Sequence, residues 1–170
     1  MATVATNSRP AKRSIAPDSY ERVLAYLICV LLAVLMVAIA RGEPHWHAVP
    51  PIIWFHLATI FVALSLTPVL LLKRRGTRQH RRLGWIWAIA MFATAVGSLF
   101  IRRATGSGWS PIHVLSALTV VLVPLIVSKA RSHDVPGHRR GVRGTVTGAL
   151  LIAGFFTLPF GRMLGTWLLG

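Results

Sequence analysis

The chain has 170 residues, of which 54% are hydrophobic and 14% charged, and its 19 basic and four acidic side chains give a net charge of +15. Soluble domains are typically about 45–50% apolar and about 25% charged, so this composition excludes an ordinary soluble domain and favours one embedded in lipid. The basic residues stand between apolar runs rather than on one soluble face. This spacing favours anionic lipid headgroups, rather than nucleic acid, as their partners.

Five apolar segments are each long enough to cross a membrane, which takes roughly 20 predominantly apolar residues. In chain order they are residues 20–40, 52–72, 83–101, 109–127 and 142–160. Residues 1–19 are polar and basic, and we expect a disordered cytoplasmic tail. A cleaved signal peptide would have a shorter tail and a shorter apolar run than the first segment has. We therefore expect an all-α, polytopic transmembrane helix bundle in which residues 20–170 form a single domain.

The distribution of Lys and Arg predicts the orientation, because cytoplasmic loops carry an excess of both. Fifteen of the 19 lie in and beside the tail and in the loops after the second and fourth segments, and four lie on the opposite side. The N-terminus is therefore predicted to be cytoplasmic and the C-terminus to lie outside.

The second and third segments resemble the fourth and fifth. Histidine, proline and a His-Arg-Arg sequence recur in the same order, as His56, Pro68 and His80 and again as His113, Pro124 and His138. The two units, about residues 52–103 and 109–162, are each predicted to form a helical hairpin. Such parallel repeats build many membrane folds, so we expect a four-helix core with the first helix on its periphery.

The four repeated histidines are the candidate cofactor ligands. An ionisable side chain within a span is a functional hypothesis by default, and neutral imidazole is an axial ligand of haem iron. His56 and His113 are predicted one turn inside the outer boundary, and His80 and His138 at the inner boundary. Each pair could hold one haem b. In the alternative, the outer histidines hydrogen-bond to a nearby Thr or Ser and the inner ones contact phosphate headgroups.

Other chemistry has little support in the sequence. There is no phosphate-binding glycine loop, no zinc-protease motif and no nucleophile elbow, so we expect no catalytic residues. His45 and His47 flank Trp46, but a metal site needs further ligands than these two. Seven basic residues are predicted to contact lipid headgroups: Lys73, Arg74, Arg75, Arg81, Arg82, Arg139 and Arg140.

Two family resemblances follow from these positions. His56, the basic run at residues 73–75 and the sequence HRRLGW at residues 80–85 resemble the bacterial membrane proteins of domain-of-unknown-function family 2306, over about residues 52–165. That resemblance implies a multi-pass protein of the bacterial inner membrane and carries no known activity.

The order of the histidines also resembles the two-haem cytochrome b-561 type. That family holds one haem between its second and fourth helices and one between its third and fifth. The resemblance implies an outer haem on His56 and His113 and an inner haem on His80 and His138. The inner histidines are predicted at or before the start of their helices, so the inner haem would be unusually exposed.

The sequence as a whole predicts a membrane protein that binds one or two haem b groups. It would transfer electrons between a quinone or cytoplasmic donor and an acceptor outside. One alternative is an accessory or lipid-binding protein without a cofactor. Another is a small proton-coupled transporter, which is disfavoured because no acidic residue is expected deep within a span to share the proton. The oligomeric state is left open.

Overall fold

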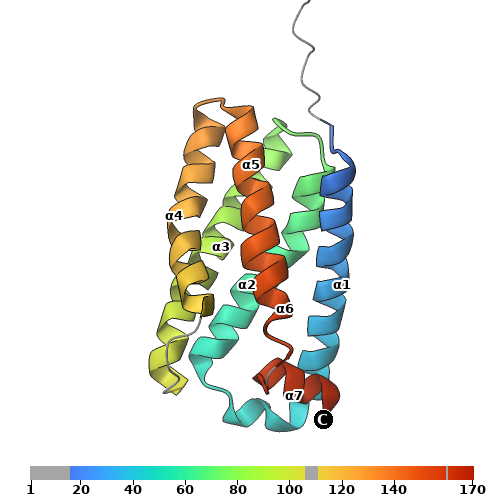
Figure 1. Cartoon of the computed structure of the whole chain (residues 1–170), viewed down its shortest axis with the longest axis vertical. Helices are drawn as coiled ribbons and strands as arrows, with labels where there is room; N and C mark the ends of the chain where they lie inside the picture. The colour runs from blue at the N-terminus through green and yellow to red at the C-terminus, as the bar shows by residue number, and fades with distance from the viewer. Residues whose placement is uncertain (1–15, 106–110, 160) are drawn as a thin grey trace, which may run out of the picture.

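In the computed structural model, the chain is described over residues 16–105, 111–159 and 161–170. These parts are all-α, as predicted, and contain no strand (Figure 1). The elements are α1 (Ser19–Arg41), the 3-10 helix η1 (Glu43–Ala48), α2 (Pro51–Leu72), α3 (Arg78–Thr105), α4 (Pro111–Arg131), α5 (Val135–Thr145), the π-helix η2 (Val146–Ile152), α6 (Ala153–Phe155) and α7 (Met163–Leu169). The predicted tail falls almost entirely on residues outside the described ranges, and Ser19 already belongs to α1.

Four of these helices are long and apolar enough to cross a membrane: α1, α2, Arg78–Ile101 within α3, and His113–Arg131 within α4. By length and composition, the chain is an integral, multi-pass membrane protein. The predicted fifth span is a composite of α5, η2 and α6, whose backbone stays right-handed helical across both junctions. At about 1.5 Å per residue its 21 residues extend about 31 Å, close to the thickness of a bilayer's hydrocarbon core.

The fifth helical run lies earlier in the chain than predicted. It begins at Val135 and ends at Phe155, whereas hydropathy indicated residues 142–160. Both ends differ from the prediction. At the start, Asp134 initiates a helix in the polar sequence around His138, which hydropathy does not detect. The Asp134 carboxylate accepts the backbone N–H of Gly137 at 2.9 Å, an N-cap bond.

The helices pack mainly on their neighbours in chain order, and the fifth helical run also packs on α1 through η2. Thus α2 contacts α1 and α3, α4 contacts α3 and α5, and η2 returns to α1 (Figure 1). The first helix contributes more to the core than its expected peripheral place implies. Its buried apolar residues are Leu24, Ala25, Ile28, Leu31, Leu35 and Ala38. A helix that buries this stripe is part of the bundle, because those side chains need partners on both α2 and η2.

One end of the bundle carries the starts of α1, α3 and α5 and the ends of α2 and α4 (Figure 1). We call it the cationic end, because the basic loops before α3 and α5 lie there. The other end is covered by α7, where the Trp167 ring lies over Gly42 so closely that a Cβ would come within 2.2 Å of it.

A buried ion cluster joins three segments at the cationic end. Glu21, in the first turn of α1, is 1% exposed and accepts hydrogen bonds from Arg139 at 2.8 and 3.0 Å and from Arg143 at 3.2 Å. Arg75, in the loop before α3, forms an ion pair with the same carboxylate. Arg139 and Arg143 also pair with Asp18. Glu21 lies in the first turn of α1 rather than deep within the span, and its buried charge is compensated by these guanidiniums.

Replacing Glu21 by Gln should destabilise the fold, because it leaves three partly buried guanidiniums without their carboxylate. Breaking a buried ion pair costs about 3–5 kcal/mol, and we expect about 3 kcal/mol here because the arginines are 11% to 26% exposed. Thermal unfolding in detergent, followed by circular dichroism, measures the loss. Glu43→Gln is the matched control, since Glu43 is exposed and forms no ion pair among the described residues. Equal losses in both variants would contradict the role given to Glu21.

Candidate functional site

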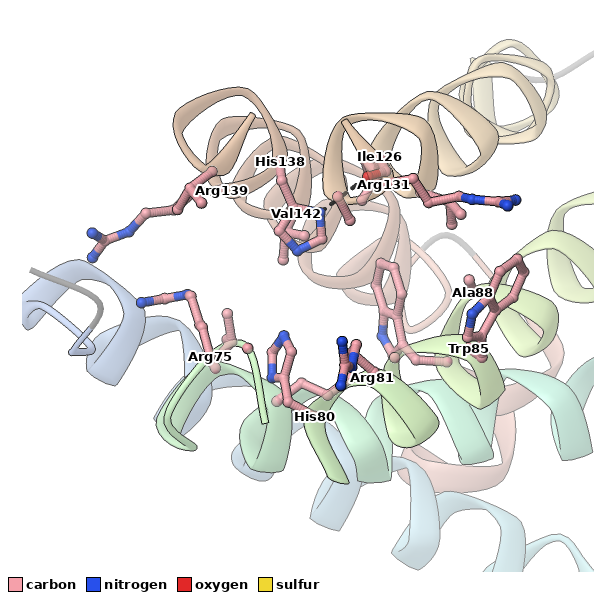
Figure 2. A pocket seen from close by; sticks show the side chains of 18 of the residues that line it. Arg75, His80, Arg81, Trp85, Ala88, Ile126, Arg131, His138, Arg139 and Val142 are labelled. Carbon is pink, nitrogen blue, oxygen red and sulfur yellow. Dashed lines mark hydrogen bonds between the residues drawn. The ribbon is translucent and has the colours of Figure 1, made fainter. Parts of the chain in front are cut away.

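A cavity of about 540 Å³ lies at the cationic end, between α2, α3, α4 and α5 (Figure 2). Pockets that hold small ligands and cofactors typically measure about 300–1,000 Å³ and combine apolar walls with a few polar groups. Here the apolar wall includes Trp85, Ala88, Ile126 and Val142. The polar lining includes three histidines and four arginines: His80, His133, His138, Arg75, Arg81, Arg131 and Arg139.

The predicted inner histidines meet in this cavity. Figure 2 shows the His80 ring rising from α3 and the His138 ring descending from α5 into the same space. The Nδ1 atom of His80 is buried and has no hydrogen-bond partner within the described ranges. The Nδ1 atom of His138 lies 3.0 Å from the Ile126 carbonyl oxygen. A carbonyl can only accept, so this Nδ1 carries the hydrogen and the lone pair of His138 is on Nε2.

Helix capping places these two rings. The Thr77 hydroxyl accepts the backbone N–H of His80 at 3.0 Å and starts α3 there. Asp134 starts α5 in the corresponding way, so both histidines lie inside the first turn of a helix. Both helices therefore begin before their histidines, whereas the sequence placed His80 and His138 at or before the helix starts. The rings are held at the wall of a cavity.

Two glycines shape the space around the rings. A Cβ at Gly84, one turn beyond His80, would have no neighbouring atom within 4 Å, so this position leaves the cavity open. A Cβ at Gly141 would come within 2.7 Å of the Ile126 side chain. The missing Cβ lets α5 approach α4 closely enough for His138 to reach the Ile126 carbonyl.

The predicted outer histidines do not line this cavity. His56 directs its Nδ1–H to the Thr94 carbonyl oxygen at 3.2 Å, within the α2–α3 contact. Beside it the Thr94 hydroxyl bonds to the Thr59 hydroxyl at 2.8 Å. His113 lies on α4, which packs against α3 and α5. His56 therefore forms a hydrogen bond to a nearby Thr, as the alternative without a cofactor predicts for an outer histidine.

The remaining candidates are spread over the surface. His45 and His47 are exposed on η1, and no group of three or more His, Cys, Asp or Glu side chains in the described part could hold a metal ion. Of the seven predicted headgroup ligands, Arg75 and Arg139 are ion-paired with Glu21, and Arg81 lines the cavity. For Lys73, Arg74, Arg82 and Arg140, headgroup contact stays a prediction.

Sequence reasoning missed several contributors to the cavity, including Glu21, Arg131 and Trp87. All three line it. Trp87 is held there because its indole N–H donates to the Thr67 hydroxyl at 2.9 Å. Glu21 had a local signal, because Asp18 and Glu21 form a capping box at the start of α1. Nothing local marked the other two, whose roles depend on which helices adjoin.

No protein-family model, curated protein or solved structure matches the chain. The two family resemblances of the sequence therefore stay expectations.

The ion cluster beside the cavity predicts a dependence of stability on pH. The backbone N–H of Glu21 and, after it, the Arg143 guanidinium lower the pKa of the Asp18 carboxyl below its ordinary value. A carboxyl whose pKa falls on folding stabilises the protein above its unfolded pKa of about 3.9, and this contribution is lost as pH falls through the folded value.

We therefore expect Asp18→Asn to reduce the loss of thermal stability that the wild type suffers between about pH 5 and pH 3. Unfolding midpoints in detergent at several pH values measure this difference, with Glu43→Gln as the control for removing an exposed carboxyl. An acid dependence identical to that of the wild type would show that Asp18 gains nothing from its partners.

Proposed function

We propose that the chain binds haem b in the cavity at its cationic end, where His80 and His138 would hold the iron, and that it transfers electrons across the membrane. The observation that carries the proposal is the meeting of two imidazoles from different helices in one cavity, where the Nδ1 of His80 is buried and has no hydrogen-bond partner among the described residues. A buried polar atom without a partner costs free energy, so its persistence suggests a ligand that uses it.

The residues present fit this group. Histidines that ligate metals usually donate their other ring N–H to a carbonyl or carboxylate, as His138 does to Ile126. Trp85, Ala88 and Val142 supply an apolar wall. The iron of haem b supplies reversible one-electron chemistry when it is bound. The chain's own part is to hold two imidazoles, to supply apolar walls, and to place Arg81 and Arg131 beside the site.

The proposal extends to the outer histidines and to orientation. A second haem between His56 and His113 would continue the path toward the α7 end. The cationic end would face the cytoplasm of a bacterial cell and receive electrons from a quinone or a cytoplasmic donor. The excess of Lys and Arg in the loops at that end supports this orientation. Anionic headgroups would meet the basic residues that form no ion pair.

The haem proposal is tested by a reduced-minus-oxidised visible spectrum of protein purified in mild detergent from cells supplied with haem precursor. We expect sharp α and Soret bands, and we expect His80→Ala and His138→Ala each to lose the haem of the inner site, because each variant removes one of its two ligands. His47→Ala is the matched control, since His47 is exposed on η1 at the other end. The pyridine-haemochrome ratio gives one haem or two, and a value of two that falls to one in His56→Ala would assign the outer site.

A flat spectrum from folded protein would contradict the proposal, and so would a haem content that is unchanged after loss of both inner histidines. The lipid-binding or accessory function would then come first. It has support of its own, since apolar walls beside arginines also suit an anionic phospholipid. Native mass spectrometry of the purified protein would detect such a lipid.

Orientation is tested by cysteine accessibility in a Cys29→Ala background. We expect Ala48→Cys, on η1, to react with a membrane-impermeant maleimide in intact cells. Ser132→Cys, between α4 and α5, should react only after the membrane is opened, because the basic loops are predicted to stay inside. Both positions are exposed, so the comparison reports the side of the membrane rather than burial. The opposite labelling pattern would reverse the proposed topology.

A further inference from the structure

The four arginines of the cavity fall into two groups that differ in their partners. Figure 2 shows Arg75 and Arg139 directed toward α1, whereas Arg81 and Arg131 lie on the other side of the histidine pair. This asymmetry bears on the chemistry of whatever ligand fills the cavity.

The arginines on the α1 side are already neutralised. Arg139 holds the Glu21 carboxylate with bonds of 2.8 and 3.0 Å and pairs with Asp18 at 3.1 Å. Arg75 pairs with Glu21 as well. Glu21 itself is a lining residue of the cavity, so its carboxylate occupies the place where an anionic ligand group would otherwise bind these two guanidiniums.

The arginines on the other side carry uncompensated charge. Arg81 follows His80 directly in α3, and Arg131 ends α4. Neither forms an ion pair with a carboxylate in the part of the chain that the structure describes. A guanidinium presents a planar fork of donors that matches a carboxylate, and a low-dielectric wall beside it strengthens the attraction. The two side chains come from different helices, so each can take a separate acidic group.

We infer that the cavity selects a ligand with two acidic groups on an apolar body, and that Arg81 and Arg131 bind those groups while Glu21 withholds Arg75 and Arg139 from them. This inference rests on the proposed function and specifies it: the two carboxylates are the propionates of the haem. Arg81 and Arg131 are thus specificity-determining residues for a dicarboxylate porphyrin.

The test compares iron protoporphyrin IX with its dimethyl ester, in which both carboxylates are capped. Each is titrated into purified apoprotein and followed by Soret absorbance and by quenching of the tryptophans in the cavity wall. Charge-assisted hydrogen bonds lead us to expect that the wild type binds the free acid about tenfold to a hundredfold more tightly than the ester. The double variant Arg81→Gln, Arg131→Gln should lose most of this preference by binding the free acid more weakly.

The matched control is the double variant Arg82→Gln, Arg140→Gln, which removes the same charge from two exposed arginines outside the cavity. It should keep the wild-type preference. Circular dichroism checks that all variants are folded. Equal affinity of the wild type for both forms, or an unchanged preference in the Arg81, Arg131 variant, overturns the inference and leaves the haem proposal standing. Failure of the wild type to bind either form overturns both.

Discussion

The burial of one carboxylate at the start of the first helix determines how this bundle closes. Glu21 is 1% exposed, and a charge removed from water in this way requires compensation by nearby opposite charge. That compensation comes from the loop before α3 and from α5, so the three segments are drawn together. The cavity lies beside this cluster, and Arg75 and Arg139 belong to both. The ion cluster therefore forms one side of the cavity and neutralises two of its four arginines.

The two histidine pairs illustrate how the same residue acquires different surroundings in a repeated hairpin. His80 and His138 stand in the first turns of helices that begin at a capping side chain, and a glycine near each leaves room or lets a neighbouring helix approach. His56 lies within a close α2–α3 contact, and its Nδ1–H is used by the Thr94 carbonyl. Packing, rather than residue type, separates the pair that shares a cavity from the pair that does not.

The haem proposal and the lipid alternative draw on the same cavity, and they differ in which of its groups they use. A phospholipid would contact the arginines and the apolar wall, and it would not need the imidazoles as ligands. A haem would use all three, including the buried nitrogen of His80 that has no partner among the described residues. The ion pairing of the arginines also separates the two ligands. Arg75 and Arg139 are paired with Glu21, and a ligand with two separate acidic groups matches the remaining Arg81 and Arg131 better than a ligand with a single phosphate.

Local patterns in the sequence determined the class of the protein and most of its helices. Apolar runs predict spans because each residue's transfer into lipid is nearly independent of the rest of the chain. They placed α1 and α2 to within one residue at each end, and the repeat paired His80 with His138, which both line one cavity. The tertiary structure alone decided that these two share a cavity and that Glu21 is buried, since Arg139 is 118 residues from Glu21. Such pairings depend on which helices adjoin, and no local pattern carries that information.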